Sequence, residues 1–225
     1  MSEIIRVGLA DDQPLVRAGF GMLVGSQDDM EVVWEVSDGD EVAAAAAARP
    51  ADVVLMDVQM PRMDGIAAAR ALLVSDESVR IIMLTTFDDA EFVRGAIEAG
   101  ASGFLLKDAT PDELLHAVRT VYEGDAVLAP KVTAQVMKMW RPKASESESV
   151  DVGLTPRESE ILKHIARGLT NEEIAAAEFV SMATVKTHVR HILMKTGSRD
   201  RVQAVLFAFR TGLVTVGELL RHPQG

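Results

Sequence analysis

The strongest constraint on the fold of this chain is a set of five short apolar runs that alternate with segments of helical periodicity. The runs cover residues 4–10, 31–36, 52–57, 79–85 and 103–107. Each run is too short for a helix and rich in Val, Ile and Leu, as strands buried on both faces are. The intervening helical segments cover residues 14–24, 40–49, 66–73, 89–99 and 111–122. This alternation predicts an α/β fold whose five-stranded, doubly wound parallel sheet is covered by helices on both sides.

Polar residues end four of these runs. Asp11-Asp12 follows the first run, Asp57 ends the third, Thr85 ends the fourth and Lys107 ends the fifth. The carboxyl ends of parallel strands share the edge of the sheet where ligands bind, so we expect these side chains to converge. Carboxylates at close range repel one another, and a hard cation with oxygen ligands, most simply Mg²⁺, relieves that repulsion.

Such a set of residues suits phosphoryl transfer. A carboxylate beside Mg²⁺ can attack a phosphoryl group and form an aspartyl phosphate, whose oxygens the hydroxyl and the ammonium then stabilise. A lone Asp after a strand is more often a helix cap or a turn residue, and this is the better interpretation of Asp11 or Asp57 taken singly. The coincidence of these residues at four strand ends favours the site.

Residues 4–124 resemble the receiver domain of two-component response regulators. The resemblance rests on Asp11-Asp12, residues 55–65, Leu84-Thr85-Thr86 and residues 99–107. It implies that Asp57 is the phosphoacceptor and that Mg²⁺ is bound by Asp57, by Asp12 directly, by Asp11 largely through water and by the main-chain carbonyl of Gln59. It also implies that Thr85 and Lys107 contact the phosphoryl group and that Phe104 is the aromatic residue that turns inward on activation. The sequence departs from the family pattern at Gln13, where His is frequent, and at Asp108, where many receivers have Pro.

The charge of the chain is unevenly distributed. The first 130 residues carry 9 Lys and Arg against 24 Asp and Glu, whereas residues 152–225 carry 10 against 7. An acidic first part and a mildly basic second part indicate two units with different partners. Between them, residues 144–149 alternate Ser and Glu after Ala and are typical of a flexible linker. We therefore predict domains at residues 1–125 and 153–225, with a linker at 126–152 that contains a possible short helix near 131–140.

The second part has the features of a small all-α domain with a helix-turn-helix. Thr155, Pro156 and Glu158 form a helix start signal, and further helices are expected at Asn171–Ala177, Ala183–Lys195 and about Arg201–Thr211. Val185 and Val189 recur at core spacing on the helix expected at Ala183–Lys195, while Lys186 and Arg190 face the other way. A basic helix face after a tight turn suits the major groove of DNA, although either residue alone is more simply a solvated surface charge.

Residues 154–214 resemble the LuxR-type helix-turn-helix domain. The resemblance rests on residues 154–158, 168–175, 184–189 and 199–205, and the whole chain is similar to NarL/FixJ-type response regulators. It implies that Lys186, Thr187 and Arg190 face base edges, that Thr184, Lys195 and the start of the Asn171 helix touch phosphates, and that the last helix dimerises.

Three residues in the second part stand where this family usually has apolar residues. They are Glu178, Thr196 and Ser198. Because a lone buried Glu is costly, we expect the Glu178 carboxylate to accept hydrogen bonds from Thr196 and Ser198. The simpler alternative is that Glu178 points to water.

These observations together predict a phosphorylation-dependent transcriptional regulator rather than an enzyme. A histidine kinase would phosphorylate Asp57 in the presence of Mg²⁺, and the phosphorylated chain would dimerise on double-stranded promoter DNA, at an inverted repeat. The alternative is a protein–protein regulator whose DNA binding is impaired by Glu178. The chain has no cysteine, no apolar run of membrane-spanning length and no signal peptide, so we expect a cytoplasmic protein without a membrane partner.

Overall fold

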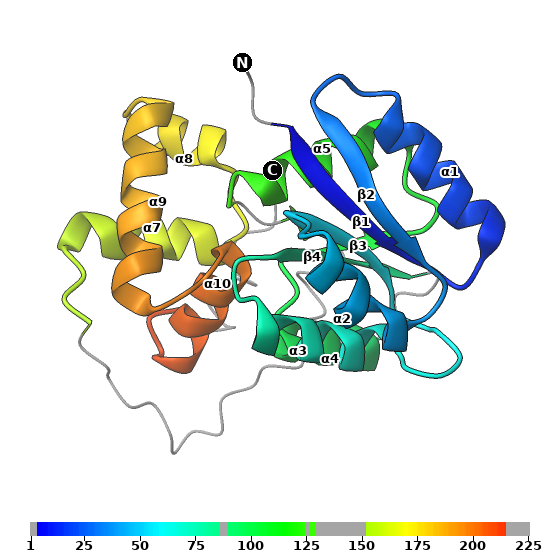
Figure 1. Ribbon diagram of the computed structural model, residues 1–225. Helices are drawn as coiled ribbons and strands as arrows, with labels where there is room; N and C mark the ends of the chain where they lie inside the picture. The colour runs from blue at the N-terminus through cyan, green and yellow to red at the C-terminus, as the bar shows by residue number, and fades with distance from the viewer. Residues whose placement is uncertain (1–3, 86–89, 125–126, 129–151, 215–225) are drawn as a thin grey trace. The chain divides into compact units, whose positions relative to one another are not determined.

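The computed structural model describes residues 4–85, 90–124, 127–128 and 152–214 (Figure 1). The chain divides into two compact units, Met1–Val132 and Thr133–Gly225. This division falls inside the segment expected to be the linker. The short helix expected near residues 131–140 lies outside the described residues.

The first unit contains a six-stranded sheet in which every neighbouring pair of strands is parallel, in the order β2-β1-β3-β4-β5-β6. The strands are β1 (Ile5–Ala10), β2 (Met30–Val36), β3 (Val53–Asp57), β4 (Arg80–Thr85), β5 (Gly103–Leu106) and β6 (Val127–Leu128). The expected five strands and their parallel arrangement are confirmed. The sequence analysis missed β6, because two residues are too few to produce a periodic signal.

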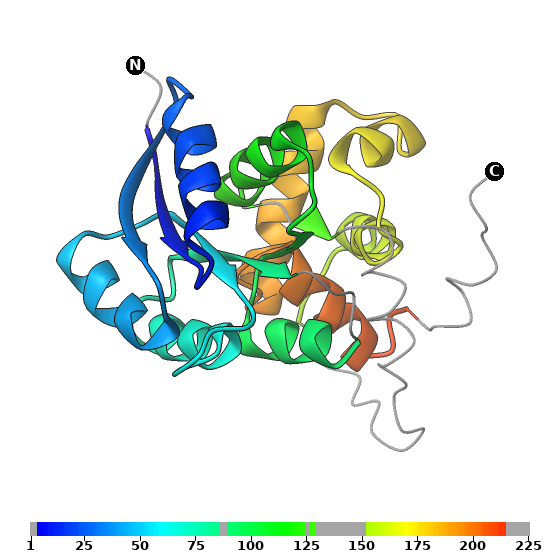
Figure 2. The same ribbon diagram turned by 90° about the vertical axis from the view of Figure 1, so that its right-hand side faces the viewer.

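Helices cover both faces of this sheet (Figure 2). They are α1 (Pro14–Gly25), α2 (Gly39–Ala48), α3 (Gly65–Ser75), α4 (Ala90–Ala99) and α5 (Pro111–Tyr122). Helix α1 packs beside α5 on one face, while α2, α3 and α4 form a row on the other. All five residues of β3 are buried, as expected of a central strand. The rigid centre of the sheet therefore carries Asp57 at its carboxyl end.

The second unit is entirely helical in its described part. Its helices are α7 (Pro156–Ala166), α8 (Asn171–Ala177), α9 (Met182–Thr196) and α10 (Arg201–Arg210). A side-chain oxygen caps the start of each helix, from Thr155, Thr170, Ser181 and Asp200. The apolar faces of the four helices enclose one core. Helix α9 ends at Gly197, whose φ of 64° is a conformation that glycine adopts without strain.

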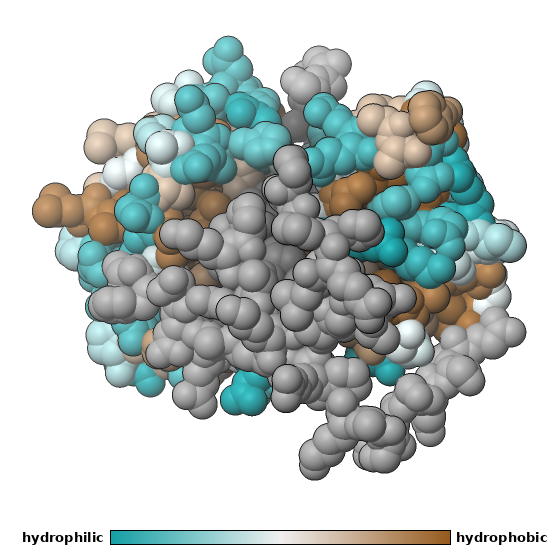
Figure 3. Space-filling view, turned by 180° about the vertical axis from the view of Figure 1, so that it is seen from behind, coloured by the Kyte–Doolittle hydropathy of each residue, from teal (hydrophilic) through white to brown (hydrophobic). Residues whose placement is uncertain are grey.

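The surface of the described residues mixes hydrophobic and hydrophilic side chains. Figure 3 shows the hydrophobic residues of the visible face in separate areas between hydrophilic ones. Among the described residues, no helix has the length and apolar character needed to cross a membrane.

A buried ion pair ties α7 to α9 in the second unit. The Glu158 side chain is only 4 % exposed, and its Oε2 accepts a bond of 2.7 Å from Lys195 Nζ and bonds from the main chain and hydroxyl of Thr155. The hydrogen bond from Lys195, with those from Thr155, lowers the pKa of Glu158 to about 2. Glu158, which belongs to the capping box of α7, therefore also holds the C-terminal turn of α9.

We predict that Glu158→Gln destabilises the second unit at neutral pH by about 2 kcal/mol, because hydrogen bonds to a charged acceptor are lost. Since the pKa of Glu158 falls from 4.5 to about 2 on folding, this stabilisation is complete above pH 4.5. It disappears as the pH falls through about 2. The urea dependence of hydrogen exchange in α7 and α9 measures the effect. Glu160→Gln is the control, because the Glu160 pair with Lys163 is exposed and should contribute under about 0.5 kcal/mol. Equal stability of the two variants at pH 7 would contradict the prediction.

Candidate functional site

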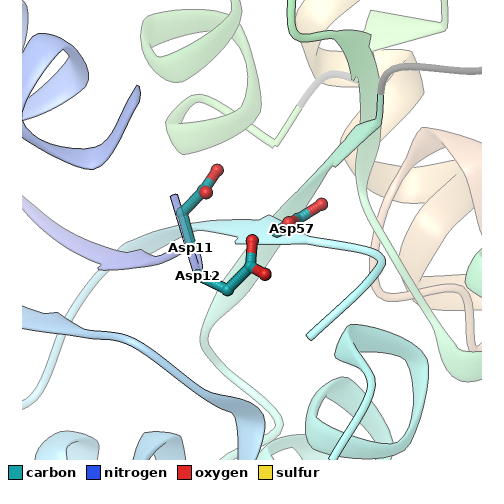
Figure 4. Close-up of side chains that lie close together, drawn as sticks. All are labelled: Asp11, Asp12 and Asp57. Atoms are coloured by element: carbon teal, nitrogen blue, oxygen red, sulfur yellow. The ribbon is translucent and has the colours of Figure 1, made fainter. Parts of the chain in front are cut away.

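Three carboxylates meet at the carboxyl edge of the sheet (Figure 4). Asp11 and Asp12 directly follow β1, Asp57 ends β3, and one carboxylate oxygen from each lies within 4.8 Å of the others. The two strands are neighbours in the sheet, which explains why residues 45 positions apart meet. Asp11 and Asp57 are buried, and Asp12 is exposed. The expected convergence of the three side chains is therefore present.

Lys107, just after β5, places its ammonium between two of these carboxylates. Its Nζ lies 2.8 Å from Asp11 Oδ2 and 2.8 Å from Asp57 Oδ2, and its side chain is only 6 % exposed. Burial raises the pKa of Asp57, and the hydrogen bond from Lys107 opposes that rise. Burial lowers the pKa of Lys107, but its bonds to Asp11 and Asp57 outweigh this effect, so its pKa is raised. Lys107 is thus held as a cation inside the cluster.

Main-chain groups orient the two buried carboxylates. The Gln13 amide donates to Asp11 Oδ1 at 2.8 Å, and the Gln59 amide donates to Asp57 Oδ1 at 3.3 Å. Gly65, the first residue of α3, lies so close that a Cβ there would sit 1.9 Å from the main-chain oxygen of Asp57. Only glycine permits this approach of α3 to the end of β3.

The loop between β3 and α3 is held by a further buried carboxylate, which the sequence analysis did not identify. Asp38 is buried and accepts bonds from the amides of Arg62 and Met63, at 3.0 and 2.9 Å. The Arg62 guanidinium also binds Asp40 and Glu41 at the start of α2. The Asp38-Gly39 pair before a helical run resembles an ordinary cap, so only the tertiary contacts distinguish it.

The two remaining residues of the expected site lie on β4 and β5. Thr85 ends β4 and is 3 % exposed, and its carbonyl accepts a bond of 2.7 Å from the Lys107 amide. Phe104 lies within β5 and is only 1 % exposed, so its ring is already directed into the protein.

In the second unit, α9 follows a tight turn and presents a polar face. Lys186, Thr187 and Arg190 are exposed, whereas Val185, Val189 and Ile192 are buried in the core. The Thr184 hydroxyl is bound to that of Ser181 at 2.9 Å, at the start of the helix. The two-faced character expected of this helix is therefore present.

Comparisons with known proteins agree on both units. The response regulator receiver domain matches residues 7–119, and the family of bacterial regulatory proteins of the luxR type matches residues 152–208. The chain belongs to the LuxR-family response regulators. These proteins combine a receiver with a DNA-binding domain and act as transcriptional regulators, and this response regulator has both parts in that order.

Relatives match over nearly the whole length of this response regulator. It is 47 % identical over 212 residues to the uncharacterized transcriptional regulatory protein YxjL of Bacillus subtilis, which covers 93 % of this chain and 97 % of YxjL. It is 41 % identical to the transcriptional regulatory protein LiaR of the same species, over 94 % and 100 % of the two chains. The crystal structure of the response regulator ChrA, from a heme-sensing two-component system, covers 95 % of this chain and 100 % of ChrA, at 40 % identity and a TM-score of 0.52.

One expectation about the second unit is wrong. The sequence analysis predicted that the Glu178 carboxylate binds Thr196 and Ser198, but its partners are Arg157 and His164, both on α7. The Thr196 hydroxyl instead lies 2.8 Å from Ser198 Oγ and 2.8 Å from the Ile192 carbonyl of its own helix. The prediction was wrong because proximity in sequence to α9 does not show which face of α7 packs against the end of α8.

Lys195 has a structural partner that the sequence analysis did not foresee. Its ammonium is held by the buried Glu158 carboxylate and by the Gly153 carbonyl. A side chain with this anchorage is less available for DNA phosphates than an ammonium without such partners. The sequence analysis interpreted Glu158 only as part of the helix start signal and did not predict its pair with Lys195.

We predict that Gly65→Ala destabilises the receiver domain by about 1–3 kcal/mol, the usual cost of forcing a methyl group into packed structure. The added Cβ would lie 1.9 Å from Asp57 O and must displace either α3 or the end of β3. Thermal unfolding measures the loss. Gly19→Ala is the control, since no atom lies within 4 Å of a Cβ at that position in α1, so stability should be unchanged or rise by up to about 1 kcal/mol. A Gly65→Ala variant as stable as the native chain would disprove the packing argument.

Proposed function

We propose that Asp57 accepts a phosphoryl group from a histidine kinase and that this modification controls DNA binding by the second unit. The observation that carries the proposal is the position of Lys107 Nζ, 2.8 Å from both Asp11 and Asp57. A buried ammonium beside the nucleophile can neutralise charge on the transferred group. In the transfer, an Asp57 oxygen attacks phosphorus, the bond from phosphorus to the kinase histidine breaks, and its electron pair remains on the imidazole.

The chemistry of the donor set fits Mg²⁺. Three carboxylates and one ammonium give the cluster a formal charge of −2, which a divalent cation balances. Asp11, Asp12 and Asp57, with the main-chain carbonyl of Gln59, would hold the ion. Bound there, it would supply electrostatic stabilisation of phosphoryl oxygens.

Thr85 and Lys107 are the residues proposed to contact the phosphoryl oxygens once Asp57 is modified. The Lys107 amide is bonded to the Thr85 carbonyl, so the ends of β4 and β5 are joined directly beside the site. Phe104 lies three residues before Lys107 and is proposed as the switch residue, whose buried position corresponds to the inward orientation. The phosphoryl group adds charge that these residues can read out.

DNA reading is assigned to the exposed face of α9. Lys186, Thr187 and Arg190 are proposed to face base edges in the major groove, and Thr184 to touch a phosphate. The start of α8 is proposed as a second phosphate contact. Lys195 is retained only as a secondary candidate, because Glu158 already neutralises its charge.

The remaining parts of the proposal concern organisation. Residues 1–125 form the receiver, residues 126–152 the linker and residues 153–225 the DNA-binding domain. Phosphorylation favours a homodimer on double-stranded DNA with an inverted repeat, because a two-fold dimer presents two equivalent helices to two half-sites. The proposed compartment is the cytoplasm.

The alternative, a protein–protein regulator with impaired DNA binding, depended on the cost of an unpaired charge at Glu178. That charge is paired with Arg157 and hydrogen-bonded to His164. The physical reason for impairment is therefore removed, and DNA binding is preferred.

We predict that Asp57→Asn abolishes the response to acetyl phosphate without abolishing DNA binding. The test is selection of genomic DNA fragments by the purified protein with Mg²⁺, before and after treatment. The native chain should enrich an inverted-repeat site only after treatment, and the variant should give the same weak enrichment in both samples. Asp28→Asn, an exposed substitution of the same type, is the control and should behave as the native chain does. Full regulation by the Asp57 variant would exclude control through this residue.

We also predict that Arg190→Ala and Lys186→Ala each weaken binding to the selected site by about 1–3 kcal/mol, the value of a good base contact. A residue that contacts only phosphate would instead weaken binding to all sequences and reduce the salt dependence by about one ion. Titration of selected and scrambled duplexes at several salt concentrations separates the two outcomes. Unchanged affinity in both variants would show that α9 is not the reading helix.

A further inference from the structure

A charged cluster in the second unit joins α7 to the turn before α9. It consists of Glu178, Arg157 and His164 and is called the Glu178 cluster below. Glu178 Oε1 lies 2.6 Å from His164 Nε2, and Oε2 is paired with the Arg157 guanidinium. A second guanidinium nitrogen of Arg157 donates to the Glu178 carbonyl at 2.9 Å. The side chains of Glu178 and His164 are both 16 % exposed, so the contacts are shielded from much of the solvent.

The two partners of Glu178 come from one face of α7. Arg157 lies in the first turn and His164 two turns later, a spacing of seven residues that returns to the same side of a helix. Glu178 is the C-cap residue of α8. One residue at the end of α8 is therefore held at its carboxylate and at its main chain by two points about 10 Å apart along α7.

The conformation of the residue after Glu178 shows what the contacts of Glu178 with α7 affect. Phe179 has a φ of 54° and is the one non-glycine residue with positive φ among those the structure describes. Such a conformation costs free energy and persists only where the surroundings enforce it. The Phe179 side chain is 96 % exposed, so it supplies no packing of its own. The conformation is enforced by its neighbours: the amides of Phe179 and Val180 donate to the carbonyls of Ala176 and Ala175, and the Glu178 carbonyl is held from α7 by Arg157.

Two residues further along, Ser181 caps α9. Its hydroxyl accepts a bond from the Thr184 amide. The turn from Glu178 to Ser181 therefore sets where α9 starts and in which direction it runs. Helix α9 packs against both α7 and α8 (Figure 1), but apolar packing restricts its direction less sharply than charge-assisted hydrogen bonds with fixed geometry do.

We propose that Glu178 is a positioning residue for DNA reading, which fixes the turn before α9 by its contacts with Arg157 and His164. This inference rests on the proposed function of α9. Glu178 touches no base; it acts through the orientation of Lys186 and Arg190. The family usually has an apolar residue at this position. In this chain, the polar contacts of the Glu178 cluster orient α9 instead.

The test uses the full-length protein and two DNA probes. One is the duplex that the native chain selects from a random library, and the other is a scrambled duplex of the same composition. The measured quantity is the ratio of the two affinities, after thermal unfolding has shown the variants to be folded. Glu178→Gln keeps the size of the side chain but weakens the contacts with Arg157 and His164. It should lower the ratio about tenfold, as one mismatched base pair does, with scrambled binding within about twofold because that binding is mainly electrostatic.

Three further variants make the outcome decisive. Glu178→Leu restores the apolar residue usual at this position and keeps the fold, yet it should also lower the ratio, because it has no directional contact. Glu160→Gln removes the same charge from the exposed side of α7 and should leave the ratio unchanged. In Glu178→Gln combined with His164→Gln, the two losses should be less than additive, since both variants remove one contact.

The positioning role is overturned if Glu178→Gln and Glu178→Leu keep the native ratio. It is also overturned if both probes weaken equally, because a purely structural role lowers the folded fraction and leaves the ratio alone. Arg190→Ala separates this result from failure of the proposed function. If Arg190→Ala lowers the ratio and the Glu178 variants do not, α9 still reads DNA and only the positioning role fails. If none of the variants lowers the ratio, base reading by α9 fails, and the positioning role fails with it.

Discussion

The mutual repulsion of Asp11 and Asp57, both buried at the end of the parallel sheet, is the constraint on which the first unit depends. Two carboxylates at this distance can remain ionised only beside a cation, and Lys107 supplies one at 2.8 Å from each. Its position after β5 requires that β3, β4 and β5 be adjacent and in register, as they are. The chemistry of the site therefore depends on the strand order of the sheet.

The second unit meets the same electrostatic requirement with cationic side chains of its own. Glu158 and Glu178 lie largely out of the solvent, and each is paired with a cation from a different element. A buried pair rarely adds much stability over an apolar pair, but the loss of one partner is costly. Such pairs therefore specify geometry more than they add free energy. Here they specify how α7 meets the two ends of the helix-turn-helix, at the C-terminal turn of α9 and at the end of α8.

The sequence predicted those features that depend on local periodicity. The strand ends at Asp11, Asp57 and Lys107 followed from short apolar runs and the geometry of parallel sheets, and the helix starts followed from capping residues such as Thr155. The partner of Glu178 could not be predicted, because it depends on which face of α7 turns toward α8. That face is decided by packing over the whole core. Sequence proximity to α9 suggested the wrong hydroxyl partners for the same reason.

The two kinds of charge cluster differ in one respect that bears on regulation. In the second unit, Glu158 and Glu178 are each neutralised by their own partners, so the geometry is fixed. In the receiver, the carboxylates outnumber Lys107 and the cluster keeps a formal charge of −2. An unbalanced negative charge favours the binding of a cation. Because the Lys107 main chain is bonded to Thr85, the proposed phosphorylation of Asp57 would act beside the joined ends of β4 and β5.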